Sequence, residues 1–254
     1  MKKVFALAGI IFILGLSQIG SASAKGIMSV PAPATTLWFS GYQWIVRSGS
    51  GGPGPNLWNP ANLWLDPSGY LHLKITHSSG RWVCAELYTV KSFGFGKYQF
   101  NVVGAIDKLD PNAVLGLFNY PTSQVGIDGT NEIDIEFSHW GDPTFPIGNY
   151  TVWPAQNVLV GKSTSKTFNF SLTNPDTTQR FTWSSQSIYF QSLRGFHNDN
   201  TGQYAGWLFK PGSYLKYIPQ HAIPVHINLW LSDGNPPVNG QGVEVVIRSF
   251  RYTP

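Results

Sequence analysis

The sequence has few charged side chains and a single cysteine. Only 12% of its 254 residues are Asp, Glu, Lys or Arg, about half of the roughly 25% that is usual for soluble domains. Long solvent-exposed helices need many such side chains, so the composition argues against a helical bundle. The one cysteine, Cys84, cannot form an internal disulfide, and it excludes zinc sites built from several cysteines.

Strongly basic segments are also missing. The pI is near 9.1, but the net charge is only +4, and two of the lysines, Lys2 and Lys3, lie at the N-terminus. No later run of Lys or Arg could neutralise a row of phosphates. We therefore expect no nucleic-acid partner.

Long apolar runs are confined to the N-terminus, where residues 1–24 have the parts of a signal peptide. Lys2 and Lys3 precede an apolar run over 4–14, and small residues end at Ala24. We expect cleavage after Ala24 and a secreted protein, extracellular or periplasmic. The alternative is a retained membrane anchor, but the run is short for a bilayer crossing. Nothing later approaches transmembrane length, so we expect no membrane contact after cleavage.

Glycine, proline and aromatic residues are abundant. The chain has 27 Gly and 18 Pro, 15% of its residues are aromatic, and 42% are hydrophobic. This composition favours a large core made of short strands joined by tight turns. Short runs of alternating apolar and polar residues predict where the strands lie. They are residues 44–46, 63–65, 70–75, 82–88, 96–103, 113–120, 132–137, 150–153, 167–172, 180–183, 188–191, 225–231 and 243–252.

Turn residues separate these runs at 66–69, 79–80, 128–129 and 232–235. No linker or shift in composition divides the chain, and the glycine-rich segment 49–55 is only as long as a loop. We therefore predict one all-β domain over residues 25–254, a two-sheet antiparallel β-sandwich.

Six histidines show no spacing typical of metal ligands, such as a helical i, i+4 pair around a Glu. We expect each to be a surface or core residue, and we predict no metal site. They are His72, His77, His139, His197, His221 and His226.

The most informative segment is 131–137, where Glu132, Asp134 and Glu136 alternate with apolar residues. In a strand these three carboxylates share one face, and the apolar residues enter the core on the other. Like charges side by side on a strand repel one another. Such an arrangement indicates a functional site; the alternatives are a solvated strand face or a calcium-binding acidic edge.

Cleavage of a glycosidic bond needs two carboxyl groups. One protonates the leaving oxygen, and the other attacks or activates water, at a separation of about 5 to 5.5 Å where configuration is retained. Glu132 and Glu136 are the candidates. Their backbones lie about 13 Å apart on a strand, so their side chains must lean together over Asp134. Asp134 can hydrogen-bond one of them and raise the pKa of the acid that must stay protonated.

The chain resembles glycoside hydrolase family 16. Residues 132–136 match the family signature Glu-aliphatic-Asp-aliphatic-Glu, and 84–87 followed by 93–96 looks like the family's Ala-Glu-Leu strand and Tyr-Gly-Tyr-Gly turn. Residues 228–230 are similar to its Asn-Leu-Trp strand, and 243–252 to its terminal strand. The resemblance covers most of the mature chain.

The resemblance implies a concanavalin A-like jelly roll with a concave substrate cleft for a glucan. By the same match, Glu132 is the nucleophile, Glu136 the acid/base and Asp134 the assisting acid. No cofactor is required, although the family allows a structural calcium ion. We expect a polysaccharide substrate and a monomer.

The signature has no inserted residue, which resembles the licheninase and xyloglucan-transferase branch of the family. The chain departs from licheninases at Thr130, where they usually have Trp, and at Tyr88, where they have Arg. Aromatic rings can stack on sugars; a plain core role is the alternative for each tryptophan chosen. The expected substrate-binding residues are Glu86, Trp140, Asn149, Trp153, Asn228 and Trp230.

The sequence therefore predicts a secreted, endo-acting glycoside hydrolase of β-glucan-type polysaccharides that retains configuration. The alternatives are a transglycosylase and a non-catalytic carbohydrate-binding jelly roll. Binding alone does not require a second carboxyl, so the presence of both Glu132 and Glu136 favours an enzyme.

Overall fold

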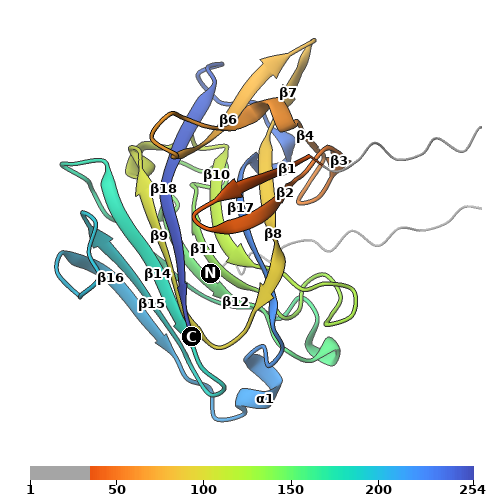
Figure 1. The fold of residues 1–254 in the computed structure, drawn as a ribbon, viewed down its shortest axis with the longest axis vertical. Helices are drawn as coiled ribbons and strands as arrows, with labels where there is room; N and C mark the ends of the chain where they lie inside the picture. The colour runs from red at the N-terminus through yellow and green to blue at the C-terminus, as the bar shows by residue number, and fades with distance from the viewer. Residues whose placement is uncertain (1–34) are drawn as a thin grey trace, which may run out of the picture.

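The computed structural model describes residues 35–254, so the predicted signal peptide and its cleavage site lie outside the described residues. The described chain folds into two large antiparallel sheets packed face to face (Figure 1). We name them sheet I and sheet II. No helix in residues 35–254 has the length and apolar content needed to span a membrane.

Sheet I contains the acidic segment near its centre. Its strands, in spatial order, are β1 (Thr36–Phe39), β2 (Tyr42–Val46), β8 (Ala85–Phe93), β17 (Ile223–Leu231), β10 (Ala113–Asn119), β11 (Ile133–Phe137), β12 (Gly148–Val152) and β13 (Thr164–Phe168).

Sheet II covers the other side of the core. Its strands, in spatial order, are β16 (Gln203–Phe209), β15 (Ile188–Arg194), β14 (Asp176–Trp183), β9 (Gly96–Val103), β18 (Val243–Thr253), β6 (Leu71–Ser78) and β5 (Leu63–Leu65), with β7 (Arg81–Val83) also paired to β6. A separate hairpin joins β3 (Gly49–Gly51) and β4 (Asn56–Trp58). The helical pieces are α1 (Tyr214–Tyr217) and single 3-10 turns at Pro60–Asn62, Ile106–Lys108, Asn157–Leu159 and Ser232–Gly234.

The core lies between the two sheets and is rich in aromatic rings. Tyr150 of sheet I stacks on Phe190 of sheet II, with ring centroids 4.9 Å apart. Tyr98 stacks on Phe181 at 4.6 Å within sheet II. Each of these side chains is buried, and aromatic pairs add to the stability that their burial already gives. The two-sheet antiparallel sandwich predicted from the sequence is what the chain forms.

Most predicted strands lie within observed strands, and three differences have physical causes. The run 82–88 is broken at Cys84, because β7 pairs with β6 of sheet II whereas β8 pairs with β2 and β17 of sheet I. The chain changes sheets at this point. The predicted strand 167–172 is wrong beyond residue 168. Phe170 leaves the sheet and stacks on Tyr204 at 4.8 Å.

The third difference is that segment 49–55 is more than a loop. Gly49–Gly51 forms β3, which pairs with β4, and Trp58 Nε1 donates a hydrogen bond to the Gly51 carbonyl at 3.1 Å. Strands β1, β4 and β16 were not predicted. In β16, Ala205 and Gly206 interrupt the alternation that would have marked a strand.

The predicted turns are present, and the one at 66–69 shows why. The Gly69 amide donates to the Asp66 carbonyl at 2.9 Å, and Gly69 has a φ of +79°, a conformation that favours glycine. The Asp66 side chain accepts hydrogen bonds from the amides of Ser68 and Tyr70.

A core substitution in β11 tests the assignment of faces. Ile135 is fully buried, so Ile135→Ala should lower the free energy of unfolding by about 2 to 5 kcal/mol. Urea unfolding measures the change. Val158 is 83% exposed, and Val158→Ala is the control, which should change stability by less than about 0.5 kcal/mol. Equal effects of the two substitutions would show that β11 does not turn Ile135 into the core.

Candidate active site

The three carboxylates lie on the face of sheet I that is turned away from the core, which we call the acidic face. Asp134 and Glu136 belong to β11, and Glu132 precedes it. The carbonyl of Glu132 accepts a hydrogen bond from the Trp153 amide at 2.9 Å, so the strand pairing continues past the end of β11. Ile133 and Ile135 between them are buried. The predicted alternation is confirmed.

Strand register places Glu136 in a row of polar residues across the sheet. Glu136 is opposite Asn149 on one side and Gly116 on the other. Gly116 is opposite Asn228, and Asn228 is opposite Glu86. A Cβ at position 116 would overlap Asn228 Oδ1, so the Asn228 side chain lies over Gly116, toward Glu136. Glycine is therefore required at 116 for this arrangement.

A second row contains Asp134 and has an aromatic side. Asp134 is opposite Phe118, then come His226 and Tyr88. His226 stacks on Tyr88 with ring centroids 5.0 Å apart at 14°, and it lies 5.0 Å from Phe118. On its other side Asp134 is opposite Thr151.

Trp153 connects the rows of Glu132 and Asp134. Its indole Nε1 donates a hydrogen bond to Asp134 Oδ2 at 2.9 Å. Three buried oxygens on the acidic face have no hydrogen-bond partner among the described residues: Asp134 Oδ1, Asn149 Oδ1 and Asn228 Oδ1. Buried acceptors are usually satisfied, so these atoms are free to accept hydrogen bonds from a ligand.

Glu86 lies in the row of Glu136, but its two oxygens are already engaged. Oε2 pairs with Arg47 at 2.6 Å, and Oε1 with His226 Nδ1 at 3.0 Å. Burial alone would raise the pKa of Glu86, but His226 and Arg47 outweigh it and hold that pKa below its usual range. The sequence prediction included Glu86 and missed both partners, since they lie in strands or loops far from it in the chain.

The pKa values of the three carboxylates are all raised. Burial raises the pKa of Glu136 to about 7, while contact with the Asn149 amide opposes the rise. Burial and then the charge of Glu136 raise the pKa of Asp134, against hydrogen bonds with Glu132 and Trp153. Burial, then the charges of Asp134 and Glu136, raise the pKa of Glu132. Because the groups titrate together, the set retains protons near neutral pH.

Glu132 and Asp134 affect each other in opposite directions. Contact with Asp134 raises the pKa of Glu132, whereas contact with Glu132 lowers that of Asp134. Glu136 holds its own proton up to about pH 7. Because such a set gives up its protons in steps, one member can be ionised while Glu136 keeps its proton.

Trp140 and Trp230 were both predicted to bind substrate, and they contact each other. Their ring centroids are 5.9 Å apart in an edge-to-face arrangement. Trp230 is only 7% exposed, whereas Trp140 is half-buried and its amide donates to Ser138 Oγ at 2.9 Å. Of the two, Trp140 has the more accessible ring.

Within residues 35–254, no group of three or more His, Cys, Asp or Glu side chains gathers in a way that could hold a metal ion.

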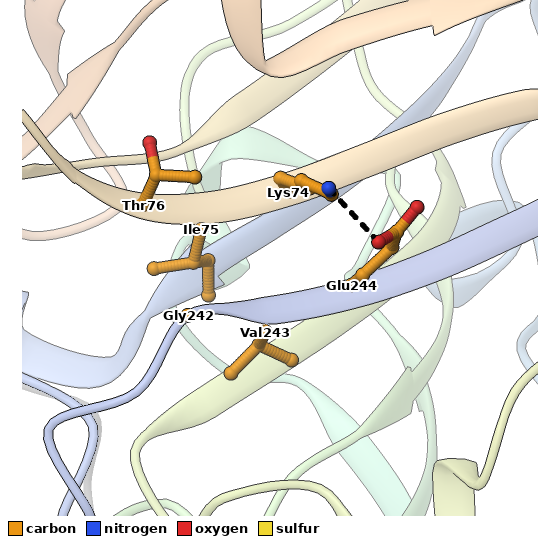
Figure 2. Close-up of a pocket in the computed structure, with 6 residues that line it drawn as sticks. All are labelled: Lys74, Ile75, Thr76, Gly242, Val243 and Glu244. Carbon is orange, nitrogen blue, oxygen red and sulfur yellow. Dashed lines mark ion pairs between the residues drawn. The ribbon is translucent and has the colours of Figure 1, made fainter.

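A hollow of about 200 Å³ lies on sheet II, between residues of β6 and of the chain that enters β18 (Figure 2). It is therefore separate from Glu132, Asp134 and Glu136 of sheet I. Figure 2 shows that its charged groups face each other, with Lys74 Nζ 3.1 Å from Glu244 Oε2. The other oxygen of Glu244 lies 2.6 Å from His72 Nδ1. These charges are satisfied by one another, so the hollow offers no free catalytic group.

Solved structures with a similar fold include β-glucanases. The Bacillus licheniformis β-glucanase is 21% identical, with a TM-score of 0.62 over 88% of this chain and 99% of that one. A prokaryotic β-1,3-1,4-glucanase (lichenase) from a mouse hindgut metagenome is 24% identical, with a TM-score of 0.57 over 85% and 95%. A Mycobacterium tuberculosis immunostimulatory antigen and pseudo β-1,3-glucanase is 18% identical, with a TM-score of 0.62 over 82% and 90%.

No protein-family model matches the chain, and no curated protein matches it in sequence. The structural likeness shows the fold, which is the jelly roll of glycoside hydrolase family 16 β-glucanases. The predicted fold class is confirmed. One neighbour is called a pseudo-glucanase, so the fold does not by itself specify an activity.

The raised pKa of Glu136 predicts an effect on stability. Its pKa in the folded state, about 7, exceeds the ordinary glutamate value of 4.5. The folded state therefore binds the proton more tightly than the unfolded state, and stability is lost as pH rises from about 4.5 through 7. Glu136→Gln removes this loss. It should stabilise the protein at pH 8 more than at pH 5, as measured by urea unfolding at both values.

The control for this prediction is Glu244→Gln on sheet II. Burial would raise the pKa of Glu244, but His72 and Lys74 lower it, so this substitution should cost stability at pH 8. A Glu136→Gln variant that is less stable than wild type at pH 8 would show that the Glu136 carboxylate is not destabilised in the folded protein.

Proposed function

We propose that the protein is a secreted, endo-acting glycoside hydrolase that cleaves a β-glucan-type polysaccharide with retention of configuration. The observation that carries the proposal is the pairing of Glu132 and Glu136 on one face of one strand. They stand on either side of Asp134, and the Glu136 pKa is about 7. Two carboxyls in different protonation states are what the reaction requires.

The chemistry proceeds in two displacements. The ionised carboxylate of Glu132 attacks the anomeric carbon while Glu136 gives its proton to the departing glycosidic oxygen. This step leaves a covalent glycosyl-enzyme and an ionised Glu136. Glu136 then takes a proton from water, whose oxygen attacks the anomeric carbon and releases Glu132.

Asp134 and Trp153 position the nucleophile. The Trp153 indole fixes one oxygen of Asp134 at 2.9 Å, and Asp134 lies between Glu132 and Glu136 on the acidic face. The charge of Asp134 raises the pKa of Glu132, so it raises the energy of the ionised Glu132 carboxylate and makes that carboxylate a stronger nucleophile. This repulsion is relieved as the bond to the sugar forms and negative charge leaves Glu132.

The acidic face supports a polymeric, largely uncharged substrate. Its rows run across several strands, and the row of Asp134 carries the neighbouring rings of Tyr88, His226 and Phe118. Such rings bind the apolar faces of sugars, and the unpartnered oxygens of Asn149 and Asn228 can accept hydrogen bonds from hydroxyl groups. The neighbours named β-glucanase and lichenase support a β-glucan. The proposed reaction needs only one copy of the protein.

A non-catalytic carbohydrate-binding protein is the second candidate, and the pseudo-glucanase neighbour favours it. A transglycosylase would use the same residues with a sugar in place of water. Product analysis on mixed-linkage glucan, laminarin, xyloglucan and agarose distinguishes these functions. Hydrolysis gives new reducing ends, transglycosylation gives rearranged chain lengths, and a binding protein leaves every polymer intact.

Amide substitutions test the two catalytic carboxyls. Glu132→Gln and Glu136→Gln should each lower kcat by several orders of magnitude, because each removes a covalent or proton-transfer role. Circular dichroism and thermal unfolding show whether the fold is kept. Glu244→Gln is the matched control and should keep near wild-type kcat.

Azide rescue assigns the two roles. Glu132→Ala with azide should yield an α-glycosyl azide, and Glu136→Ala should yield the β-product, since the first lacks the nucleophile and the second only the acid/base. Products with the opposite anomers would reverse the assignment. Near wild-type kcat in either Gln variant would remove that residue from the mechanism.

Asp134→Asn tests the electrostatic coupling inside the site. The charge of Glu136 raises the pKa of Asp134, and the interaction is reciprocal. Neutralising Asp134 should therefore lower the pKa of Glu136 and move the alkaline limb of the kcat/KM profile to lower pH. A profile that superimposes on that of wild type would show that Asp134 acts by position alone.

A further inference from the structure

An exposed tryptophan lies on the acidic face at the far edge of sheet I. Trp38 in β1 is 67% exposed, which is unusual for so large an apolar side chain. Its neighbours Leu37 and Phe39 pack against the core, so Trp38 points to the opposite face. That face is the one that carries Glu132, Asp134 and Glu136.

Strand register confirms this placement. Trp38 is opposite Gln43 of β2, and Ile45, two residues further along β2, is opposite Tyr88 of β8. Tyr88 is opposite His226, in the row that leads to Asp134. Directly opposed residues in antiparallel strands share a face. Trp38 is thus one step along the strands from the aromatic end of the Asp134 row.

Trp38 borders an open hollow of about 360 Å³. The hollow combines an indole face with polar side chains, and its lining residues are Trp38, Gly41, Tyr42, Gln43, Val90 and Lys91. Gln43, which lies opposite Trp38, can donate hydrogen bonds to hydroxyl groups. No carboxylate lines it. A flat apolar platform beside a neutral donor suits a sugar ring.

The distance from the carboxylates is that of a few sugars. β1 is the fifth strand from β11 in the order β1-β2-β8-β17-β10-β11, which at about 4.8 Å per strand is about 24 Å. A β-linked chain lying across the strands, with about one sugar per strand, would place its fourth or fifth sugar from the cleaved bond at Trp38.

We propose that the hollow at Trp38 is a distal subsite for a sugar of the same polysaccharide chain that is cleaved at Glu132 and Glu136. The proposal rests on the proposed function. Its occupant is a β-linked glycan, because Trp38 lies on the acidic face, across β2 from the aromatic row that leads to the carboxylates. Trp38 then determines how strongly long chains are preferred over short ones.

The test is a chain-length series. Wild type and Trp38→Ala are compared on whichever of mixed-linkage glucan, laminarin, xyloglucan or agarose the wild type hydrolyses fastest, and on its oligosaccharides. For chains long enough to reach the hollow, Trp38→Ala should lower kcat/KM by about fivefold to tenfold, mainly through KM. For trimers and tetramers it should change kcat/KM by less than about twofold. Trp38→Phe keeps a flat ring and should restore most of the loss.

Leu208→Ala is the control, since Leu208 is 56% exposed but lies in β16 of sheet II. It should leave the series unchanged. Equal losses on short and long chains with Trp38→Ala, or no loss on either, would overturn the distal subsite. So would a wild-type dimer in sedimentation that Trp38→Ala dissociates, because the hollow would then bind a second copy.

Retardation in native gels containing each of the four polymers separates failure of this proposal from failure of the proposed function. A wild type that cleaves no polymer contradicts the enzyme, whereas its retardation, weakened in Trp38→Ala but not in Leu208→Ala, would still support a sugar at Trp38. A wild type that cleaves polymer, but with retardation and chain-length preference unaffected by Trp38→Ala, contradicts the subsite alone.

Discussion

The site depends on the burial of three apolar side chains in β11. Ile133, Ile135 and Phe137 are fully buried between the sheets, and burial of each such side chain stabilises the fold by about 1.5 to 3 kcal/mol. Because side chains alternate along a strand, this anchoring holds Glu132, Asp134 and Glu136 together on the other face, against their mutual repulsion. The apolar half of the strand therefore maintains an arrangement that the acidic half alone would disfavour.

The repulsion has a chemical consequence. Three carboxylates close together and partly buried cannot all ionise near neutral pH, and the raised pKa of about 7 at Glu136 reflects the cost of its burial. Elsewhere the protein holds a buried acid with a cation and a ring nitrogen, as it does for Glu86 with the Arg47 guanidinium and His226 Nδ1. Around β11 it provides the amides of Asn149 and the indole of Trp153 instead. A cation there would lower the pKa of Glu136. The acid that donates the proton in the proposed reaction would then already be ionised.

Sequence patterns predicted what is local and missed what depends on register. The alternation in 131–137 identified both the strand and the three carboxylates, because side-chain period and motif lie within a few residues. The clamp on Glu86 joins residues 39 and 140 positions away in the chain, and no local signal marks such a pairing. In the sequence, Gly116 looks like an ordinary strand glycine. Its role is visible only in the structure, where Asn228 lies over it. Trp38 was missed because its short strand, β1, has no clear alternation.

The two sides of β11 differ in length and in chemistry. Beyond β11, sheet I continues through β10, β17, β8, β2 and β1 on one side, but only through β12 and β13 on the other. In the row of Asp134, the longer side carries Phe118, His226 and Tyr88, whereas the shorter side carries Thr151 and Ser165, whose hydroxyls bond each other at 2.8 Å. Stacking on rings holds a sugar without strict geometry, whereas hydroxyl groups hold it by directional hydrogen bonds that water can replace. In a two-step displacement one half of the substrate must stay while the other leaves. We expect the half on the longer, aromatic side to be the one that stays.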